Sequence, residues 1–328
     1  MRWLVTGANG FVGRALVRRL LSQGLPGGRA LTQLAVTDFA LDEDLVDPRL
    51  LRLQGDLTQP ATWAEAFATP LDGIFHLASV PGGTAEAQPA LARAVNLDAT
   101  QSLLDHCQAQ VERGGVAPRL VFASTIAVYG AALPPEVTDH TPAAPHMVYG
   151  AHKLMAEIAV AHASRRGWVD GVSLRLPGIL VRPPAPTGQL SAFMSDFIRE
   201  LSQGRPFTCP TSPGATTWAS SLPNVIHNLL HAAVVDAARL PPSRSLLLPT
   251  LRFSMAELAE AIARVFGVPA PALVRWSPDE RIEQLFGRFP PLRTDAAERA
   301  GFVSDGDGDT LVRQSLQPYE PPAPTAGR

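Results

Sequence analysis

The chain has 328 residues, enough for two domains or for one large domain with an insertion. Its 28 basic and 30 acidic side chains give a formal net charge of −2, which excludes the strong positive field that attracts nucleic acid or an anionic membrane surface. Two cysteines, Cys107 and Cys209, are too few for a disulfide framework. No apolar run is long enough for a signal peptide or a membrane span, so we expect a cytoplasmic protein that binds no nucleic acid and no membrane.

The first half of the sequence alternates short apolar runs with segments of helical periodicity. The apolar runs predict strands over residues 2–6, 34–37, 50–53, 73–77, 119–124 and 172–176. The longest helices are expected over 85–113 and 148–166. Strands that alternate with helices are joined by right-handed crossovers, so this half predicts an α/β fold with a doubly wound parallel sheet of the Rossmann type.

The second half begins with the proline-rich residues 182–186, which indicate a rigid linker or loop. Further helices are predicted over 190–203, 223–238, 255–266 and 278–286, and short strands over 245–248 and 273–276. We expect a first domain over 1–181, with a returning segment near 222–250, and a smaller, interleaved C-terminal domain over 182–221 and 251–317. Residues 318–328 are predicted to be a disordered tail.

Three glycines at intervals of three residues lie between the first strand and the first helix, in the segment Thr6-Gly7-Ala8-Asn9-Gly10-Phe11-Val12-Gly13. Such a turn lets a pyrophosphate approach the backbone, and the helix N-terminus presents free N–H groups to it. A purely structural turn is the alternative reading. The first domain is therefore predicted to bind a dinucleotide through Gly7, Asn9, Gly10, Phe11, Val12 and Gly13.

Two acidic residues follow the next two predicted strands. Asp38 is placed to accept the two ribose hydroxyls of the adenosine and to repel a 2′-phosphate, which favours NAD over NADP. Asp56, followed by Leu57, is placed to meet the adenine amino group, although a helix N-cap or a solvated turn is the alternative for this carboxylate.

A tyrosine and a lysine four residues apart carry the predicted chemistry. Lys153 is the single lysine among the 28 basic residues, and it follows Tyr149 on a predicted helix, where side chains four apart share a face. A phenol with a pKa of about 10 is a poor base near neutrality, but a nearby positive charge lowers such a pKa by about 1–3 units. The pair therefore predicts a general base, with a chance spacing as the alternative.

Hydroxyls stand at the end of the strand predicted over 119–124, in Ser124 and Thr125. Because ligands of a doubly wound sheet bind outside the carboxyl ends of its strands, such a hydroxyl can orient the substrate oxygen.

Together these motifs resemble the extended short-chain dehydrogenase/reductase family, also called the NAD-dependent epimerase/dehydratase family. The resemblance is carried by TGxxGFVG at 6–13, His-Leu-Ala at 76–78, Asn96, STxxVYG at 124–130 and YGxxK at 149–153. It implies that Thr125 takes the catalytic Ser/Thr position with Ser124 beside it, that Tyr149 is the acid/base, and that Lys153 binds ribose and tunes the tyrosine. It also implies a homodimer formed by the helices over 85–113 and 148–166, and further cofactor contacts from Leu77, Ala78, Ser79, Asn96 and Leu176.

Signatures typical of family members that act on nucleotide sugars are absent after the sixth strand and near residues 218–223. The stretches 164–171, 174–183 and 275–279 resemble the D-erythronate dehydrogenase branch, whose members oxidise a four-carbon sugar acid at C2. A guanidinium grips a carboxylate with two hydrogen bonds, so Arg182 is the candidate for the substrate carboxylate, with a surface arginine as the alternative.

Other substrate contacts are expected from Ser79, Thr125 and Tyr149, and from Trp218 unless it is a core residue. Two other functions stay open: a nucleotide-sugar epimerase or dehydratase that recycles its NAD, and a non-catalytic NAD-sensing protein. The pair His227 and His231 and the aspartates of 305–309 lack the remaining ligands of a zinc or calcium site, so no metal is expected.

Overall fold

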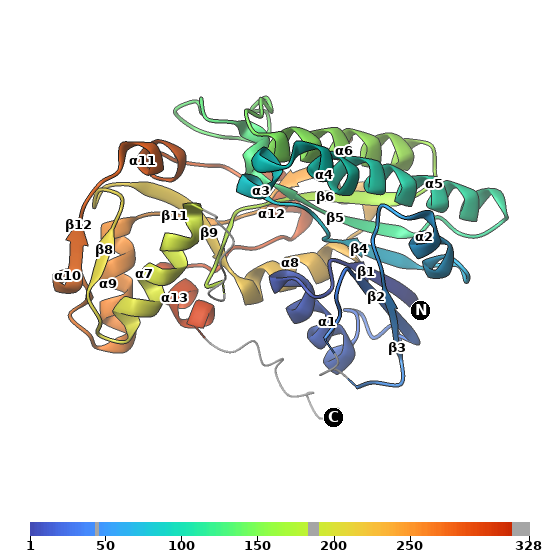
Figure 1. The fold of residues 1–328 in the computed structure, drawn as a ribbon, viewed down its shortest axis with the longest axis horizontal. Helices are drawn as coiled ribbons and strands as arrows, with labels where there is room; N and C mark the ends of the chain where they lie inside the picture. The colour runs from blue at the N-terminus through green and yellow to red at the C-terminus, as the bar shows by residue number, and fades with distance from the viewer. Residues whose placement is uncertain (43–45, 183–189, 317–328) are drawn as a thin grey trace.

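A parallel sheet of seven strands forms the centre of the computed structural model, which describes residues 1–42, 46–182 and 190–316 (Figure 1). The strand order is β10-β6-β5-β4-β1-β2-β3, and every pair is parallel. These strands are β1 (Arg2–Thr6), β2 (Gln33–Asp38), β3 (Leu50–Gln54), β4 (Gly73–His76), β5 (Arg119–Thr125), β6 (Asp170–Leu176) and β10 (Ser245–Leu247). The order reverses between β1 and β4, which creates the crevice where such sheets bind ligands.

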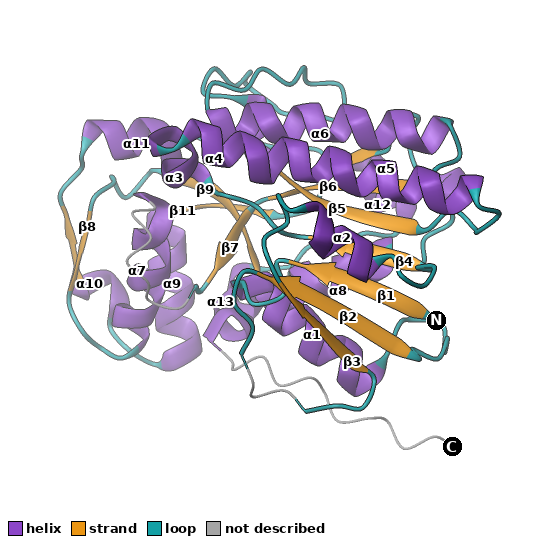
Figure 2. Cartoon of the chain, turned by 45° about the vertical axis from the view of Figure 1, so that its right-hand side comes forward, coloured by secondary structure: helices purple, strands orange, loops and turns teal. Residues whose placement is uncertain are grey.

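Both faces of this sheet are covered, because its strands are apolar on both sides. Every residue of β1, β4 and β5 is buried. One face carries α1 (Phe11–Gln23), α8 (Leu222–Ala232) and α12 (Asp295–Ala300), and the other carries α2 (Pro60–Ala66), α5 (Ala99–Glu112) and α6 (Val148–Arg165). Figure 2 shows α5 and α6 running side by side across the sheet. The predicted α/β fold with a parallel sheet is confirmed.

A second group of elements lies beyond the carboxyl ends of the strands (Figure 1). It contains the sheet β11-β9-β7, the pair β12-β8, and a separate apolar core around Phe197, Leu258 and Ile262. Its strands are β7 (Gly178–Leu180), β8 (Phe207–Cys209), β9 (Thr216–Ser221), β11 (Leu251–Ser254) and β12 (Val274–Trp276). Its helices are α7 (Phe193–Ser202), α9 (Met255–Phe266), α10 (Ala270–Leu273), α11 (Glu280–Phe286) and α13 (Gly308–Leu316). Short 3-10 turns are η2 (Ile126–Tyr129), η3 (Leu190–Ala192) and η4 (Ala237–Arg239).

The single long helix predicted over 85–113 is wrong. The segment forms α3 (Gly82–Ala87), α4 (Pro89–Arg93), a π-helical turn η1 (Ala94–Asp98) and then α5. Gln88, with φ −134° and ψ 67°, leaves the helical region because the proline ring after it clashes with a helical backbone. The π turn carries Asn96, which is buried.

Several elements of the second half were not predicted. Strand β9 has the sequence TTWASS, which lacks an apolar alternation. The strand β7 and the helices α12 and α13 were not predicted either. Helix α8 ends at Ala232, short of the predicted residue 238. Residues 183–186 of the expected linker and the expected tail lie outside the described residues.

Candidate active site

The glycine turn after β1 is built so that no side chain fits into it. Gly7 has φ +69°, and a Cβ atom there would lie 2.7 Å from the backbone nitrogen of Ala78. A Cβ on Gly13 would lie 2.0 Å from the carbonyl oxygen of Gly7. Helix α1 then begins at Phe11 with no side-chain cap and no acidic residue in its first turn. An uncapped helix N-terminus beside bare backbone suits the pyrophosphate of a dinucleotide.

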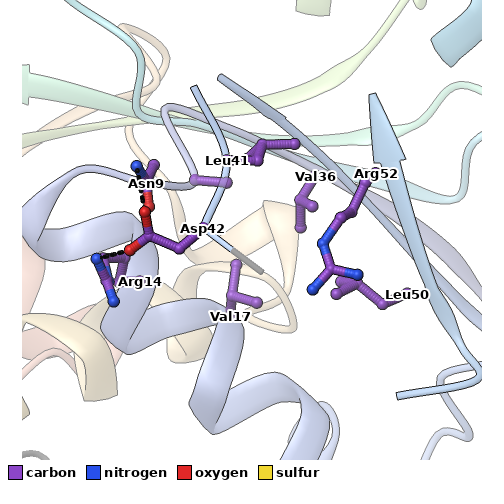
Figure 3. A pocket seen from close by; sticks show the side chains of 9 residues that line it. Asn9, Arg14, Val17, Val36, Leu41, Asp42, Leu50 and Arg52 are labelled. Carbon is purple, nitrogen blue, oxygen red and sulfur yellow. Dashed lines mark hydrogen bonds and ion pairs between the residues drawn. The ribbon is translucent and has the colours of Figure 1, made fainter. Parts of the chain in front are cut away.

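Asp38 stands beside this turn, at the end of β2. One of its carboxylate oxygens accepts a hydrogen bond from the Asn9 backbone N–H at 2.9 Å, and the other accepts from the Phe39 N–H at 2.7 Å. Figure 3 shows the neighbouring depression, where the Asp42 carboxylate pairs with Arg14 and meets the Asn9 amide, and where Arg52 extends alongside. The carboxylate of Asp38 is thus fixed at the position where the sequence predicts the ribose hydroxyls to bind.

Asp56 has a local partner. Its Oδ1 accepts a hydrogen bond from the Thr58 N–H at 2.9 Å, and the next residue, Leu57, is buried and accepts the indole N–H of Trp63 at 2.8 Å. The structure therefore contains the turn that was the alternative for Asp56, and a contact with adenine stays a prediction.

A buried hydrogen-bonded chain supports the loop after β4. Thr100 donates to the Asn96 carbonyl at 2.9 Å, so its oxygen accepts from His76 Nε2, also at 2.9 Å. His76 Nδ1 then accepts from the Thr6 hydroxyl at 2.7 Å. Burial, and next the charge of Lys153, lower the pKa of His76 to about 3, so the imidazole is neutral.

The same series of hydrogen bonds positions three residues that are expected to contact the cofactor, Leu77, Ala78 and Asn96. The backbone N–H groups of Leu77 and Ala78 donate to Thr6 Oγ1 at 3.2 and 3.3 Å. The side-chain amide of Asn96 holds the Val80 backbone, at 2.7 Å to its N–H and 2.9 Å to its carbonyl. Sequence reasoning missed the structural part played by Thr6 and by Thr100, because hydroxyls 94 positions apart show no joint pattern.

Tyr149 and Lys153 lie on one side of α6, toward β5. The helix begins here because the Val148 N–H donates to the Glu86 carboxylate at 2.6 Å. Lys153 is 1% exposed, and its Nζ donates to the Ala123 carbonyl at 2.8 Å. The same nitrogen lies 5.8 Å from the centre of the Tyr149 ring. The phenol and the ammonium therefore lie close together, as the sequence predicts.

The electrostatics of the phenol differ from the expectation. Burial raises the pKa of Tyr149 above its ordinary value, and this outweighs the lowering by the hydroxyl of Ser79, the charge of Arg182 and the hydroxyl of Thr125. Burial also lowers the pKa of Lys153 to about 7, against a raising effect of Glu157. The protein's own groups thus leave the phenol protonated near neutrality, since burial penalises the phenolate.

Two neighbouring hydroxyls of β5 have different partners. The Thr125 hydroxyl lowers the pKa of the Tyr149 phenol, and it also accepts a hydrogen bond from the Ala127 N–H at 3.1 Å. Ser124 instead donates to the buried carboxylate of Glu157. Consecutive strand residues point in opposite directions, so only one of the two can face the phenol. The Ser124 hydroxyl thus connects β5 to α6, and a part for it in catalysis beside Thr125 stays a prediction.

The expected substrate residues separate into two groups. Ser79 and Arg182 act on Tyr149, and Arg182 is only partly exposed, with its backbone N–H bonded to Ser195 Oγ at 3.1 Å. Trp218 is 1% exposed, and its indole N–H donates to the Pro290 carbonyl at 2.8 Å. Trp218 is therefore a core residue, which corrects its expected place in the pocket wall.

Leu176 ends β6, in register with Thr125, and it is partly buried against the core of the main sheet. The Nε2–H of His231 donates a hydrogen bond to the Ala300 carbonyl at 2.8 Å. In the described part of the chain, no group of three or more His, Cys, Asp or Glu residues could hold a metal. No helix among the residues placed by the structure is both long and apolar enough to cross a membrane.

Comparison with known families decides the assignment. The model described as "NAD dependent epimerase/dehydratase family" matches residues 3–216. The chain belongs to this family. NAD fits the residues present, because the bare glycine turn, the uncapped start of α1 and the Asp38 carboxylate lie together.

Relatives extend over almost the whole chain. A D-erythronate dehydrogenase of Cupriavidus necator is 38% identical over 97% of this chain and 98% of its own length. A D-erythronate dehydrogenase of Haemophilus influenzae is 29% identical, over 97% of this chain and 99% of its own length. Among solved structures, a nucleoside-diphosphate-sugar epimerase from Agrobacterium tumefaciens has a TM-score of 0.88 at 31% identity, covering 95% of this chain and 92% of that one. The family member described here is an NAD-dependent oxidoreductase.

Proposed function

We propose that this chain oxidises a small sugar acid at its C2 hydroxyl, converting D-erythronate to 2-dehydro-D-erythronate. The observation that carries the proposal is the Lys153 ammonium 5.8 Å from the centre of the Tyr149 ring. Burial raises the pKa of this phenol, whereas the Ser79 hydroxyl, the charge of Arg182 and the Thr125 hydroxyl lower it. An anionic substrate of four carbons needs such a set: a cation for its carboxylate, and a base and a hydrogen-bond partner for its alcohol. Near full-length similarity to two D-erythronate dehydrogenases supports the choice of substrate.

Each residue has one part in the proposed reaction. Arg182 holds the carboxylate, and Thr125, with Ser79, orients the C2 hydroxyl toward the Tyr149 oxygen. Tyr149, in its phenolate form, takes the hydroxyl proton and becomes the phenol as the C2–H and O–H bonds break and the C2 carbonyl forms. NAD, when bound, accepts the C2 hydrogen with both electrons of its bond. The proton then leaves the Tyr149 phenol for solvent, which restores the phenolate for the next turnover.

The proposed division of labour follows the two groups of elements. The main sheet, with the turn 7–13, Asp38 and the loop at 77–80, holds the cofactor. The smaller group, entered at Arg182, holds the substrate. We further propose a homodimer through α4 and α6, because three large apolar side chains are exposed there: Leu91 at 44%, Met155 at 43% and Ile158 at 61%.

A second candidate is a nucleotide-sugar epimerase that recycles its NAD. It is favoured by the 31% identity to the Agrobacterium tumefaciens epimerase over 95% of this chain. The substrate signatures of such enzymes are absent from this sequence, which is why we place it second. A protein that binds NAD without catalysis has little use for a tyrosine that meets a buried lysine, and it is the third candidate.

The experiment that tests the proposal offers NAD with D-erythronate, with other four-carbon sugar acids, or with UDP-sugars, and follows absorbance at 340 nm. The proposed function predicts accumulation of NADH with D-erythronate, and a product that carries a carbonyl at C2. Conversion of a UDP-sugar without net NADH supports the epimerase instead. Tight NAD binding with no turnover of any of these compounds supports the sensing protein.

A further inference from the structure

A second polar network lies behind the Tyr149 and Lys153 pair. Its centre is Glu157, which is 2% exposed and lies one helical turn beyond Lys153 on α6. The Glu157 carboxylate accepts the hydroxyl of Ser124 and the guanidinium of Arg175, with Arg175 Nη2 at 2.7 Å and Nε at 3.0 Å. Arg175 also donates to the Tyr129 hydroxyl at 2.9 Å. The network thus joins α6, β5, β6 and η2.

Burying such a charged network has a free-energy cost, and packing alone does not require it. Removing two charges from water costs several kcal/mol per ion, and apolar residues of similar volume often stabilise a protein as well or better. Burial lowers the pKa of Arg175, but its hydrogen bonds and charge interaction with Glu157 raise it above the ordinary value. The guanidinium of Arg175 therefore stays charged beside Glu157, and the buried position of this acidic side chain needs an explanation.

Glu157 follows Lys153 by four residues on α6, so the two side chains share one face of the helix, and the carboxylate raises the pKa of the lysine. Lys153 is buried among Phe122, whose ring centre is 4.6 Å from Nζ, and the backbone of Ala123. The titratable groups that act on it or on Glu157 are Tyr149 on α6, His76 on β4, Arg175 on β6 and, through Arg175, Tyr129 on η2. His76 is neutral, so Glu157 supplies the negative charge that favours the ammonium form.

We propose that Glu157 is a positioning residue that keeps Lys153 protonated where it meets Tyr149, with Arg175 holding the carboxylate in place. Tyr149, Lys153 and Glu157 follow one another at intervals of four residues and form one line along α6. The inference deepens the proposed function and uses the same reacting phenol. Its direct test does not depend on catalysis.

The test uses the fact that Lys153 is the single lysine of the chain. Protein labelled with 13C at the lysine Cε atom gives one side-chain signal, whose shift against pH reports the pKa of Lys153. An opposite charge at close range shifts a pKa by about 1–3 units, so Glu157→Gln is expected to lower the midpoint by at least about one unit. Arg175→Gln leaves the carboxylate without its counter-charge and is expected to raise the midpoint. Tyr129→Phe removes a hydrogen bond but no charge, and its midpoint should match the wild type.

Opposite shifts in Glu157→Gln and Arg175→Gln support the proposal, because general damage to the site cannot move one pKa in both directions. If Glu157→Gln does not fold, the neutral pair Glu157→Gln with Arg175→Met takes its place, and its midpoint should also fall. A midpoint within about 0.3 units of the wild type in the folded variant overturns the proposal, since the thermal energy scale makes so small a shift negligible.

The activity of the full-length enzyme gives a second readout. In the oxidation of D-erythronate, the pH at which kcat/KM falls on the alkaline side should be lower in Glu157→Gln and higher in Arg175→Gln than in the wild type. A merely structural role would lower kcat/KM at every pH without shifting this midpoint. If the wild type does not oxidise D-erythronate, the proposed function fails, and the lysine titration still decides the part played by Glu157.

Discussion

Lys153 Nζ lies 5.8 Å from the centre of the Tyr149 ring and donates its hydrogen bond to Ala123. The ammonium therefore sits beside the phenol and is anchored to the strand that also carries Thr125. This arrangement ties the lysine to β5 beside the tyrosine, while burial raises the pKa of the phenol.

Replacing Arg182 tests the carboxylate site. We expect Arg182→Gln to raise the KM for D-erythronate by at least about tenfold, because a hydrogen bond to a charged group contributes about 1.5–3 kcal/mol. Arg182→Lys should recover only part of this loss, since an ammonium cannot form the paired bonds of a guanidinium. Initial rates at saturating NAD provide the measurement. The exposed Arg205→Gln serves as the control, and equal KM values for all variants would show that the carboxylate binds elsewhere.

Replacing Asp38 tests the choice of cofactor. Asp38→Ala removes the acceptor for the ribose hydroxyls and the repulsion of a 2′-phosphate, so the ratio of kcat/KM for NAD over NADP should fall by about tenfold or more. Asp56→Ala is the matched control, because the Asp56 carboxylate has its partner in the Thr58 backbone at 2.9 Å. A preference for NAD that is unchanged in Asp38→Ala would assign the discrimination to another residue.

The buried His76 is expected to make the free energy of unfolding depend on pH in the acidic range. The unfolded imidazole takes up a proton below pH 6.5, whereas the folded one does so only near 3. The unfolded state thus binds more protons in this window, and the free energy of unfolding decreases as the pH falls through it, by about 1.4 kcal/mol per pH unit. Urea unfolding of the wild type and His76→Asn at several pH values checks this, because the difference between them isolates His76. Parallel curves for the two proteins would contradict the assignment.

The proposed dimer is tested by a charge on its exposed apolar surface. Ile158→Asp is expected to give a monomer in sedimentation velocity, because burying an unpaired carboxylate in an interface costs several kcal/mol. Val116→Asp alters a residue of similar exposure, 67% against 61%, outside the helices concerned. A wild type that is monomeric, or an Ile158→Asp variant that stays dimeric, would rule out this surface as the interface.

Local pattern predicted the elements around the cofactor site. Each of the strands β1 to β6 contains a short group of apolar residues, and the glycine spacing marks the turn where the backbone at Gly7 approaches the backbone at Ala78. The same reasoning failed at β9, which is buried as the central strand between β11 and β7 although its sequence is not apolar.

Side-chain roles that depend on distant partners could not be predicted. Ser124 and Glu157 are 33 positions apart, and the hydroxyl turns to the carboxylate because α6 crosses β5 at that point. Trp218 is fixed by the Pro290 carbonyl, 72 positions away. The motif Tyr-x-x-x-Lys showed which residues meet, but the burial that raises the phenol pKa is a property of the folded chain.

The most direct measurement of the central claim is the rate of NADH formation from D-erythronate by Tyr149→Phe. Loss of a general base lowers a rate by about 10²–10⁴-fold, and the variant should fall within that range while its affinity for NAD, measured by fluorescence titration, stays that of the wild type. A Tyr149→Phe enzyme that oxidises D-erythronate at the wild-type rate would contradict the account, because the proton would then leave through another group.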